Sequence, residues 1–98
     1  MATIRELLDR NPICLEIVRY FSRHTEAADT ARGIAEWWIQ RDLPGTAEAL
    51  AHLERCGIVR SYPVQDATSV YAYTKNPLLR QTLQHYVAVA ARAAVEPA

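Results

Sequence analysis

Few residues in this chain of 98 could bind a metal or take part in catalysis. His52 and Cys56 are four positions apart in a segment with helical periodicity, so their side chains share one face of that helix. Imidazole and thiolate groups both bind zinc, but a zinc site normally has three or four ligands, and no other Cys or His is near in sequence. We therefore predict no metal site and a structural role for Cys56.

Catalytic patterns are also missing from the sequence. His24 and His85 have no Ser, Cys or carboxylate arranged with them as a catalytic partner. The chain has three glycines and contains neither a Gly-rich phosphate loop nor an H-E-x-x-H motif. Cys14 falls on the apolar face of its predicted helix, which favours a place in the core. The sequence predicts a protein that is not an enzyme and needs no cofactor.

Composition predicts one globular domain over residues 1–98. Half of the residues are hydrophobic, and 22% are charged, as is usual for folded proteins. Eleven basic residues balance eleven acidic ones, for a formal net charge of +0. Nucleic-acid binders of this size usually carry an excess of Lys and Arg, so the balance argues against strong DNA affinity.

The two cysteines and the apolar runs indicate where the protein resides. Cys14 and Cys56 are far apart and have no C-x-x-C spacing, so a reducing compartment is the simpler setting. The first residues, "MATIRELLDRN", alternate charged and apolar residues and do not resemble a signal peptide. No apolar run approaches the ~20 residues of a membrane span. We expect a cytoplasmic protein that does not contact membranes.

The predicted elements are mostly helices, each opened by a recognisable capping residue. Thr3 and Glu6 have capping-box spacing, Asn11 and Asn76 each precede a proline, and Asp42 is a good N-cap. The expected helices cover about 3–10, 11–23, 30–39, 42–56 and 77–94. Gly57 then ends the fourth helix, since glycine suits a left-handed closing position.

After Gly57 the pattern changes from helix to strand. The runs "IVRSYPV" and "VYAYT" are rich in β-branched and aromatic residues, and the polar cluster "QDATS" separates them. This predicts a hairpin of two strands. Tyr71 and Tyr73 are two residues apart on the second strand, so they share a face, which we expect to lie against the helical core.

Three segments resemble the winged helix-turn-helix superfamily. "IAEWW" is similar to the first helix of the motif, "TAEALAHLERCGIV" to its recognition helix, and "VYAYTKN" to its second wing strand. The resemblance spans roughly Asn11 to Arg92 and is closest to small bacterial regulators of the MarR, ArsR and PadR kind. It implies a mainly α fold with a small β-hairpin, an extra N-terminal helix and a long C-terminal helix. The implied winged-helix core covers residues 10–75, and the C-terminal helix covers residues 76–94.

The resemblance also implies binding to double-stranded DNA, with residues 43–56 in the major groove and the wing on the backbone. The implied groove contacts are Thr46, Ala47, His52 and Arg55, and the implied phosphate contacts are Arg41, Arg60 and Lys75. From Ala27 to Arg60, however, the sequence contains four basic residues and five acidic ones. The wing turn has Asp66 and no cation. An alternative is a winged-helix adaptor whose partner is another protein.

The adjacent tryptophans cannot both face one core, because neighbours on an α-helix point about 100° apart. Trp38 falls in the buried stripe with Ile34 and Ala35, which predicts a core position. Trp37 lies beside that stripe. It either covers the edge of the core, with Arg41 over its ring, or anchors a partner or a second copy of the chain.

The last predicted helix carries an apolar stripe that is long for a small domain. In the family that this chain resembles, terminal helices commonly pair across a two-fold axis, which predicts a homodimer. The predicted interface residues are Leu79, Leu83, Tyr86, Val87 and Ala90. The alternative is that the stripe folds back onto its own domain. A small-molecule effector pocket between the dimer helices and the core is a further alternative, and nothing in the sequence names its ligand.

Overall fold

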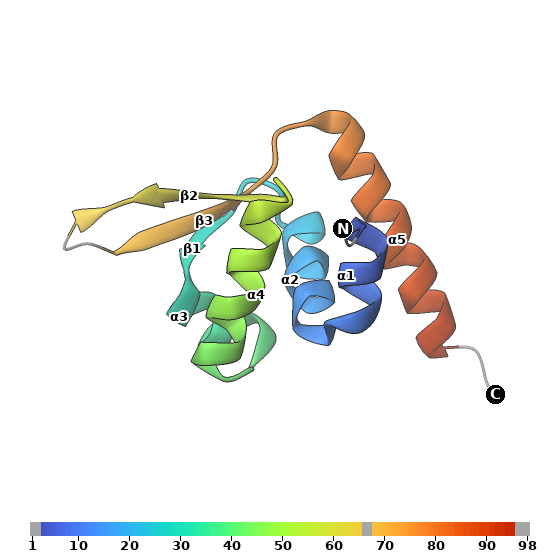
Figure 1. The fold of residues 1–98 in the computed structure, drawn as a ribbon, viewed down its shortest axis with the longest axis horizontal. Coiled ribbons are helices and arrows are strands. Elements are labelled where there is room, and N and C mark those ends of the chain that lie inside the picture. The colour runs from blue at the N-terminus through green and yellow to red at the C-terminus, as the bar shows by residue number, and fades with distance from the viewer. Residues whose placement is uncertain (1–2, 66–67, 96–98) are drawn as a thin grey trace.

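The fold, seen in a computed structural model, places helices around one core with a projecting sheet (Figure 1). The structure describes residues 3–65 and 68–95, so Asp66 of the predicted wing turn lies outside the described residues. Within these ranges, no helix is both long and apolar enough to cross a bilayer. The elements are α1 (Ile4–Arg10), α2 (Pro12–Arg23), β1 (Ala28–Thr30), α3 (Ala31–Gly33), the π-helix η1 (Ile34–Ile39), α4 (Leu43–Arg55), β2 (Val59–Pro63), β3 (Ser69–Tyr73) and α5 (Pro77–Val95).

The predicted capping residues begin the helices as expected. The hydroxyl of Thr3 accepts a hydrogen bond from a backbone N–H of α1, and the side chains of Asn11 and Asp42 do the same for α2 and α4. The Asn76 side chain accepts from two N–H groups at the start of α5. Gly57 follows α4 with φ of 76°, a left-handed conformation that glycine adopts without steric cost. These contacts confirm the predicted helix starts.

The sheet has three antiparallel strands in the order β1-β3-β2. The predicted hairpin of β2 and β3 is confirmed, with Val59 paired to Tyr73 at its base and Pro63 paired to Ser69 near its turn. The strand β1 was not expected, because its sequence Ala-Asp-Thr has neither alternation nor strong β-propensity. Its pairing with β3 therefore comes from tertiary structure rather than local preference.

The core lies between α2, α4 and the sheet and is closed by α1 and α5. Its buried hydrophobic residues are Leu8, Cys14, Ile17, Val18, Tyr20, Phe21, Ile34, Ala49, Leu50, Leu53, Ile58, Val59, Tyr73 and Leu83. The rings of Phe21 and Tyr73 stack with centroids 5.7 Å apart, and Tyr71 packs partly buried against the same cluster. The prediction that both strand tyrosines face the helical core is confirmed.

The π-helix explains why Trp38 is not in this core. A π-turn contains one residue more than an α-turn. Ile39, five residues after Ile34, therefore packs against the core, where an α-helix would have placed Trp38. The Trp38 side chain is 49% exposed, so the prediction of a buried Trp38 is wrong. Gln40 ends the π-helix in the left-handed conformation, with φ of 55°.

The apolar stripe of α5 closes the core of its own domain, as the alternative stated. Leu83 is fully buried, and Leu79, Tyr86 and Val87 pack partly buried against the core cluster. The prediction that Leu83 contacts a second copy is therefore wrong, because its side chain has no exposed surface. Arg80 fixes the start of the helix, since its Nε donates to the Thr74 carbonyl and its guanidinium lies over the Tyr73 ring.

Candidate nucleic-acid interface

The helix α4 and the β2–β3 hairpin lie on the side of the molecule away from α5 (Figure 1). Leu50 and Leu53 of α4 are fully buried and fix the helix against the core. Its opposite face presents Ala47, Glu48 and Arg55 to solvent. An exposed helix beside a projecting hairpin is the arrangement with which winged helices enter the major groove.

Three side chains of this face interact along α4. A guanidinium nitrogen of Arg55 lies 2.6 Å from Nδ1 of His52, and Nε2 of His52 lies 3.8 Å from the Glu48 carboxylate. Arginine can only donate, so Nδ1 of His52 accepts in this contact, while Nε2 faces Glu48. This chain of contacts orients Arg55 along the helix and leaves its other N–H groups available to an acceptor.

Thr46 does not belong to the exposed face. Its side chain is fully buried, so the predicted contact between Thr46 and DNA is wrong. The periodicity of α4 accounts for this, because Thr46 precedes Ala49, Leu50 and Leu53 by three, four and seven residues and shares their inward side. Its hydroxyl has no hydrogen-bond partner among the residues that the structure describes.

Replacing Thr46 with valine is expected to raise the free energy of unfolding by about 1 kcal/mol. Valine has nearly the same shape and removes the cost of a buried hydroxyl without a partner. Urea denaturation of the two proteins measures the difference. Thr46→Ser is the matched control, since it keeps the hydroxyl and removes a methyl group, and it should lower stability. A clear loss of stability in Thr46→Val would show that the hydroxyl is satisfied.

Arg41 is engaged in an ion pair rather than free for a phosphate. Its Nε and a terminal nitrogen donate to the two carboxylate oxygens of Glu16, at 2.8 and 3.0 Å. The hydrogen bond and charge of Glu16 raise the pKa of Arg41 above its ordinary value. The pair joins the segment before α4 to α2, so Arg41 positions the helix, and the expected contact with the Trp37 ring does not form.

Arg60 and Lys75 lie at the base of the wing rather than at its tip. Arg60 pairs with Ala72 one step from the base of the hairpin, and Lys75 follows the end of β3. Neither forms an ion pair with any described carboxylate. The Ser61 hydroxyl donates to Glu54, which ties β2 to the end of α4. Arg60 and Lys75, which have no described carboxylate partner, thus lie on elements that adjoin the helix of Arg55.

His52 and Cys56 do not form a metal site with other residues. In the ranges 3–65 and 68–95, no three residues of the types His, Cys, Asp and Glu come together. Cys56 is exposed beyond the last turn of α4, whereas Cys14 is buried with its thiol 3.7 Å from the Ala49 carbonyl. Burial, followed by the charges of Cys56 and Glu48, raises the pKa of Cys14 to about 11.

The two thiols are expected to differ sharply in reactivity. The reactive form is the thiolate, and at neutral pH Cys14 stays protonated and out of contact with solvent. A thiol reagent at pH 8 should label one cysteine in the folded protein and two after denaturation in urea, as counted by mass spectrometry. The Cys56→Ser protein should label at neither position while folded. Rapid labelling of Cys14 in that variant would contradict its burial.

The exposed aromatic residues of η1 are a feature that sequence periodicity missed. Trp37 is 77% exposed, so it does not cover the edge of the core, and its role as an anchor for a partner remains a prediction. The pairing of Glu16 with Arg41 was also missed, since the residues are 25 positions apart and no local pattern connects them.

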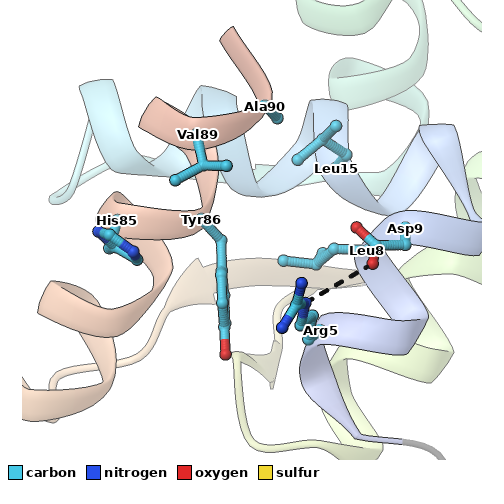
Figure 2. Close-up of a pocket in the computed structure, with 8 residues that line it drawn as sticks. All are labelled: Arg5, Leu8, Asp9, Leu15, His85, Tyr86, Val89 and Ala90. Carbon is cyan, nitrogen blue, oxygen red and sulfur yellow. Dashed lines mark ion pairs between the residues drawn. The ribbon is translucent and has the colours of Figure 1, made fainter. Parts of the chain in front are cut away.

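A cavity of ≈ 430 Å³ lies between α1, α2 and α5 (Figure 2). Leu8, Leu15 and Tyr86 form part of its apolar wall, and Arg5 and Asp9 pair at one edge with a distance of 3.9 Å. Ala90, a predicted dimer residue, also lines it. Tyr86 and Ala90 therefore border a recess on the side of the molecule opposite the wing.

Two solved structures share this fold. MepR, a transcription regulator of the Staphylococcus aureus multidrug efflux pump MepA, matches 85% of this chain with a TM-score of 0.63 and 19% identity. This chain spans 62% of the MepR chain. The structure of a transcriptional regulator homologue from Pyrococcus horikoshii OT3 matches 93% of this chain and 99% of its own, with a TM-score of 0.63 and 17% identity.

At these identities the likeness establishes the fold alone. The chain has the winged helix-turn-helix fold, which confirms the prediction made from its three motif segments. MepR is described as a transcription regulator, and the Pyrococcus protein as a transcriptional regulator homologue. No family model and no curated protein matches the chain.

Proposed function

We propose that this protein is a transcription regulator that binds double-stranded DNA through α4 and the wing. The observation that carries the proposal is the exposed face of α4 beside a projecting hairpin, in a fold shared with two proteins described as transcription regulators. A rigid helix with small residues at its exposed start can approach base edges closely. Leu43–Arg55 is such a helix, with Ala47 exposed near its N-terminal end.

The proposed contacts follow from the charges of this face. Arg55 provides donors for base edges, His52 holds the Arg55 guanidinium beside them, and Ala47 provides close apolar contact. Arg60 and Lys75, which lack carboxylate partners among the described residues, bind phosphates. Arg41 holds α4 in place through Glu16 instead of contacting DNA. This short set of cations predicts weak binding by one copy.

A homodimer would double these contacts and is part of the proposal. One face of α5 closes the core, and the other bears apolar residues that a second copy would cover, because Leu78 is 73% and Val89 49% exposed. Tyr86 and Ala90 border the adjoining recess. We therefore assign residues 10–75 to the DNA-binding unit and residues 76–94 to a helix that serves both the core and the dimer. An isologous dimer is the commonest assembly.

Fluorescence anisotropy of a labelled random duplex tests this function. We expect micromolar binding at low salt that weakens markedly near ~150 mM salt, because phosphate contacts release counterions. Arg92→Gln, which removes an exposed cation from α5, is the control and should bind like the wild type. If the protein does not bind even at low salt, the proposal fails, and a protein partner becomes the better interpretation of the α4 face.

A further inference from the structure

A second recess lies between α2 and η1, away from the cavity beside α5. Its volume is ≈ 330 Å³, within the range of ~300–1,000 Å³ that is usual for small-molecule sites. Its wall includes Arg19, Tyr20, Arg23, His24 and Trp38, and we call it the Trp38 pocket. None of these residues has a role in the proposed DNA contacts.

Trp38 is held in a fixed orientation at this pocket. Its indole N–H donates to Oδ2 of Asp29 at 3.0 Å, while Oδ1 of Asp29 accepts from the backbone N–H of Thr30. The ring packs against Tyr20, with centroids 4.8 Å apart, and against His24 at 5.5 Å. Since the side chain is still 49% exposed, the indole presents an oriented aromatic surface to solvent.

The local backbone keeps Trp38 at the surface instead of in the core. The π-helix moves Ile39 onto the core and leaves Trp38 at the rim, and Gln40 then adopts a left-handed conformation. A β-carbon at Gly33 would overlap the carboxylate of Asp29, so glycine leaves room for the residue that holds the indole. Departures of this kind from regular helix geometry are frequent at functional sites.

The Trp38 pocket has two positively charged side chains without a partner among the described residues. Arg19 and Arg23 are one helical turn apart on α2, and neither guanidinium forms a hydrogen bond or ion pair with any described residue. The Glu16 carboxylate also lines the pocket but is bound on both oxygens by Arg41. Burial, followed by the charge of Asp29, raises the pKa of Tyr20, so its phenol stays neutral.

These features together define a class of ligand. Two free guanidinium groups suit a dianionic phosphate better than a single carboxylate, because each can donate two hydrogen bonds to it. An oriented indole face favours stacking by a planar ring. We propose that the Trp38 pocket binds a small planar ring bearing a phosphate, of the kind found in a nucleoside monophosphate. This binding does not depend on the proposed DNA contacts.

The test uses tryptophan fluorescence, since each indole can be isolated. The Trp37→Phe protein keeps Trp38 as its only tryptophan, and Trp37 is exposed enough for the change to leave the fold intact. Titration with AMP should quench this emission to saturation. Adenosine has the ring without the phosphate, and inorganic phosphate has the anion without the ring. Each should therefore bind at least about tenfold more weakly than AMP. In the Trp38→Phe protein the emission comes from Trp37 alone, and AMP should cause no saturable change in it.

Charge removal completes the test. The double variant Arg19→Gln/Arg23→Gln in the Trp37→Phe background should raise the Kd for AMP by about tenfold or more, while Arg92→Gln should not change it. Circular dichroism confirms that each variant is folded. Quenching that does not saturate, or a Kd unaffected by the double variant, would overturn the proposal. Inorganic phosphate binding as tightly as AMP would also overturn it, because the ring would then contribute nothing.

Discussion

Replacement of Leu83 with alanine is expected to lower the free energy of unfolding by about 2–5 kcal/mol. Leu83 is fully buried and belongs to the core cluster, although it lies on the C-terminal helix that was expected to contact a second copy. Its removal leaves a cavity under α5 that the packed helix cannot close. Urea denaturation followed by circular dichroism measures the loss.

Leu78 provides the matched control on the same helix. Its side chain is 73% exposed, so Leu78→Ala should change the stability of the folded monomer by no more than about 0.5 kcal/mol. The measurement is made at several protein concentrations, because dimerisation would add a concentration-dependent contribution. If Leu83→Ala were neutral, α5 would not close the core, and the described packing of the C-terminal helix would be wrong.

The second large effect is on DNA affinity. Arg55→Glu is expected to weaken binding to a random duplex by about tenfold or more, because one phosphate- or base-contacting cation is lost and an anion takes its place. The new carboxylate would join Glu48 and Glu54 on the same helix and repel the backbone. The loss should be greatest at low salt, where charge contributes most. Fluorescence anisotropy at two salt concentrations measures both effects.

Arg92→Glu makes the same change in net charge on α5 and serves as the control. Arg92 is exposed and lies outside the α4 and wing surface, so its reversal should reduce affinity only slightly. Equal losses in the two variants would mean that net charge, rather than the α4 face, governs binding. An unaffected Arg55→Glu protein would remove this residue from the interface.

Local sequence signals were sufficient for most of the fold. Asn11, Asp42 and Asn76 begin their helices through the side-chain hydrogen bonds that their types predicted, and Gly57 ends α4 at positive φ. Such features depend on a few neighbouring residues and are visible in the sequence. The change to strand periodicity after Gly57 likewise predicted the hairpin.

Features that depend on distant contacts could not be predicted in the same way. The strand β1 forms because β3 lies beside it, and the pairing of Arg41 with Glu16 joins segments 25 residues apart. The π-turn is a third case. An α-helical period placed Trp38 in the core, and one extra residue in the turn placed Ile39 there instead. The opposite faces of α5 were also indistinguishable, since both carry apolar residues.

For the candidate site, helical periodicity predicted α4 itself, but the inward and outward directions of its residues were not all assigned correctly. Ala47 and Arg55 are exposed on α4 as expected, whereas Thr46 is buried. The family resemblance named positions without regard to their inward or outward direction, and the periodicity of the same helix already placed Thr46 inward. The pairing of Arg41 with Glu16, which bears on its predicted phosphate contact, was not visible in the sequence.

We propose that α4 and the wing form the surface that meets DNA. Titration of uniformly ¹⁵N-labelled protein with a duplex, followed by amide chemical shifts, tests it residue by residue. We expect the largest shifts in Leu43–Arg55 and in the strands Val59–Pro63 and Ser69–Tyr73. Shifts confined to other segments, or no shifts at protein and DNA concentrations well above micromolar, would contradict it.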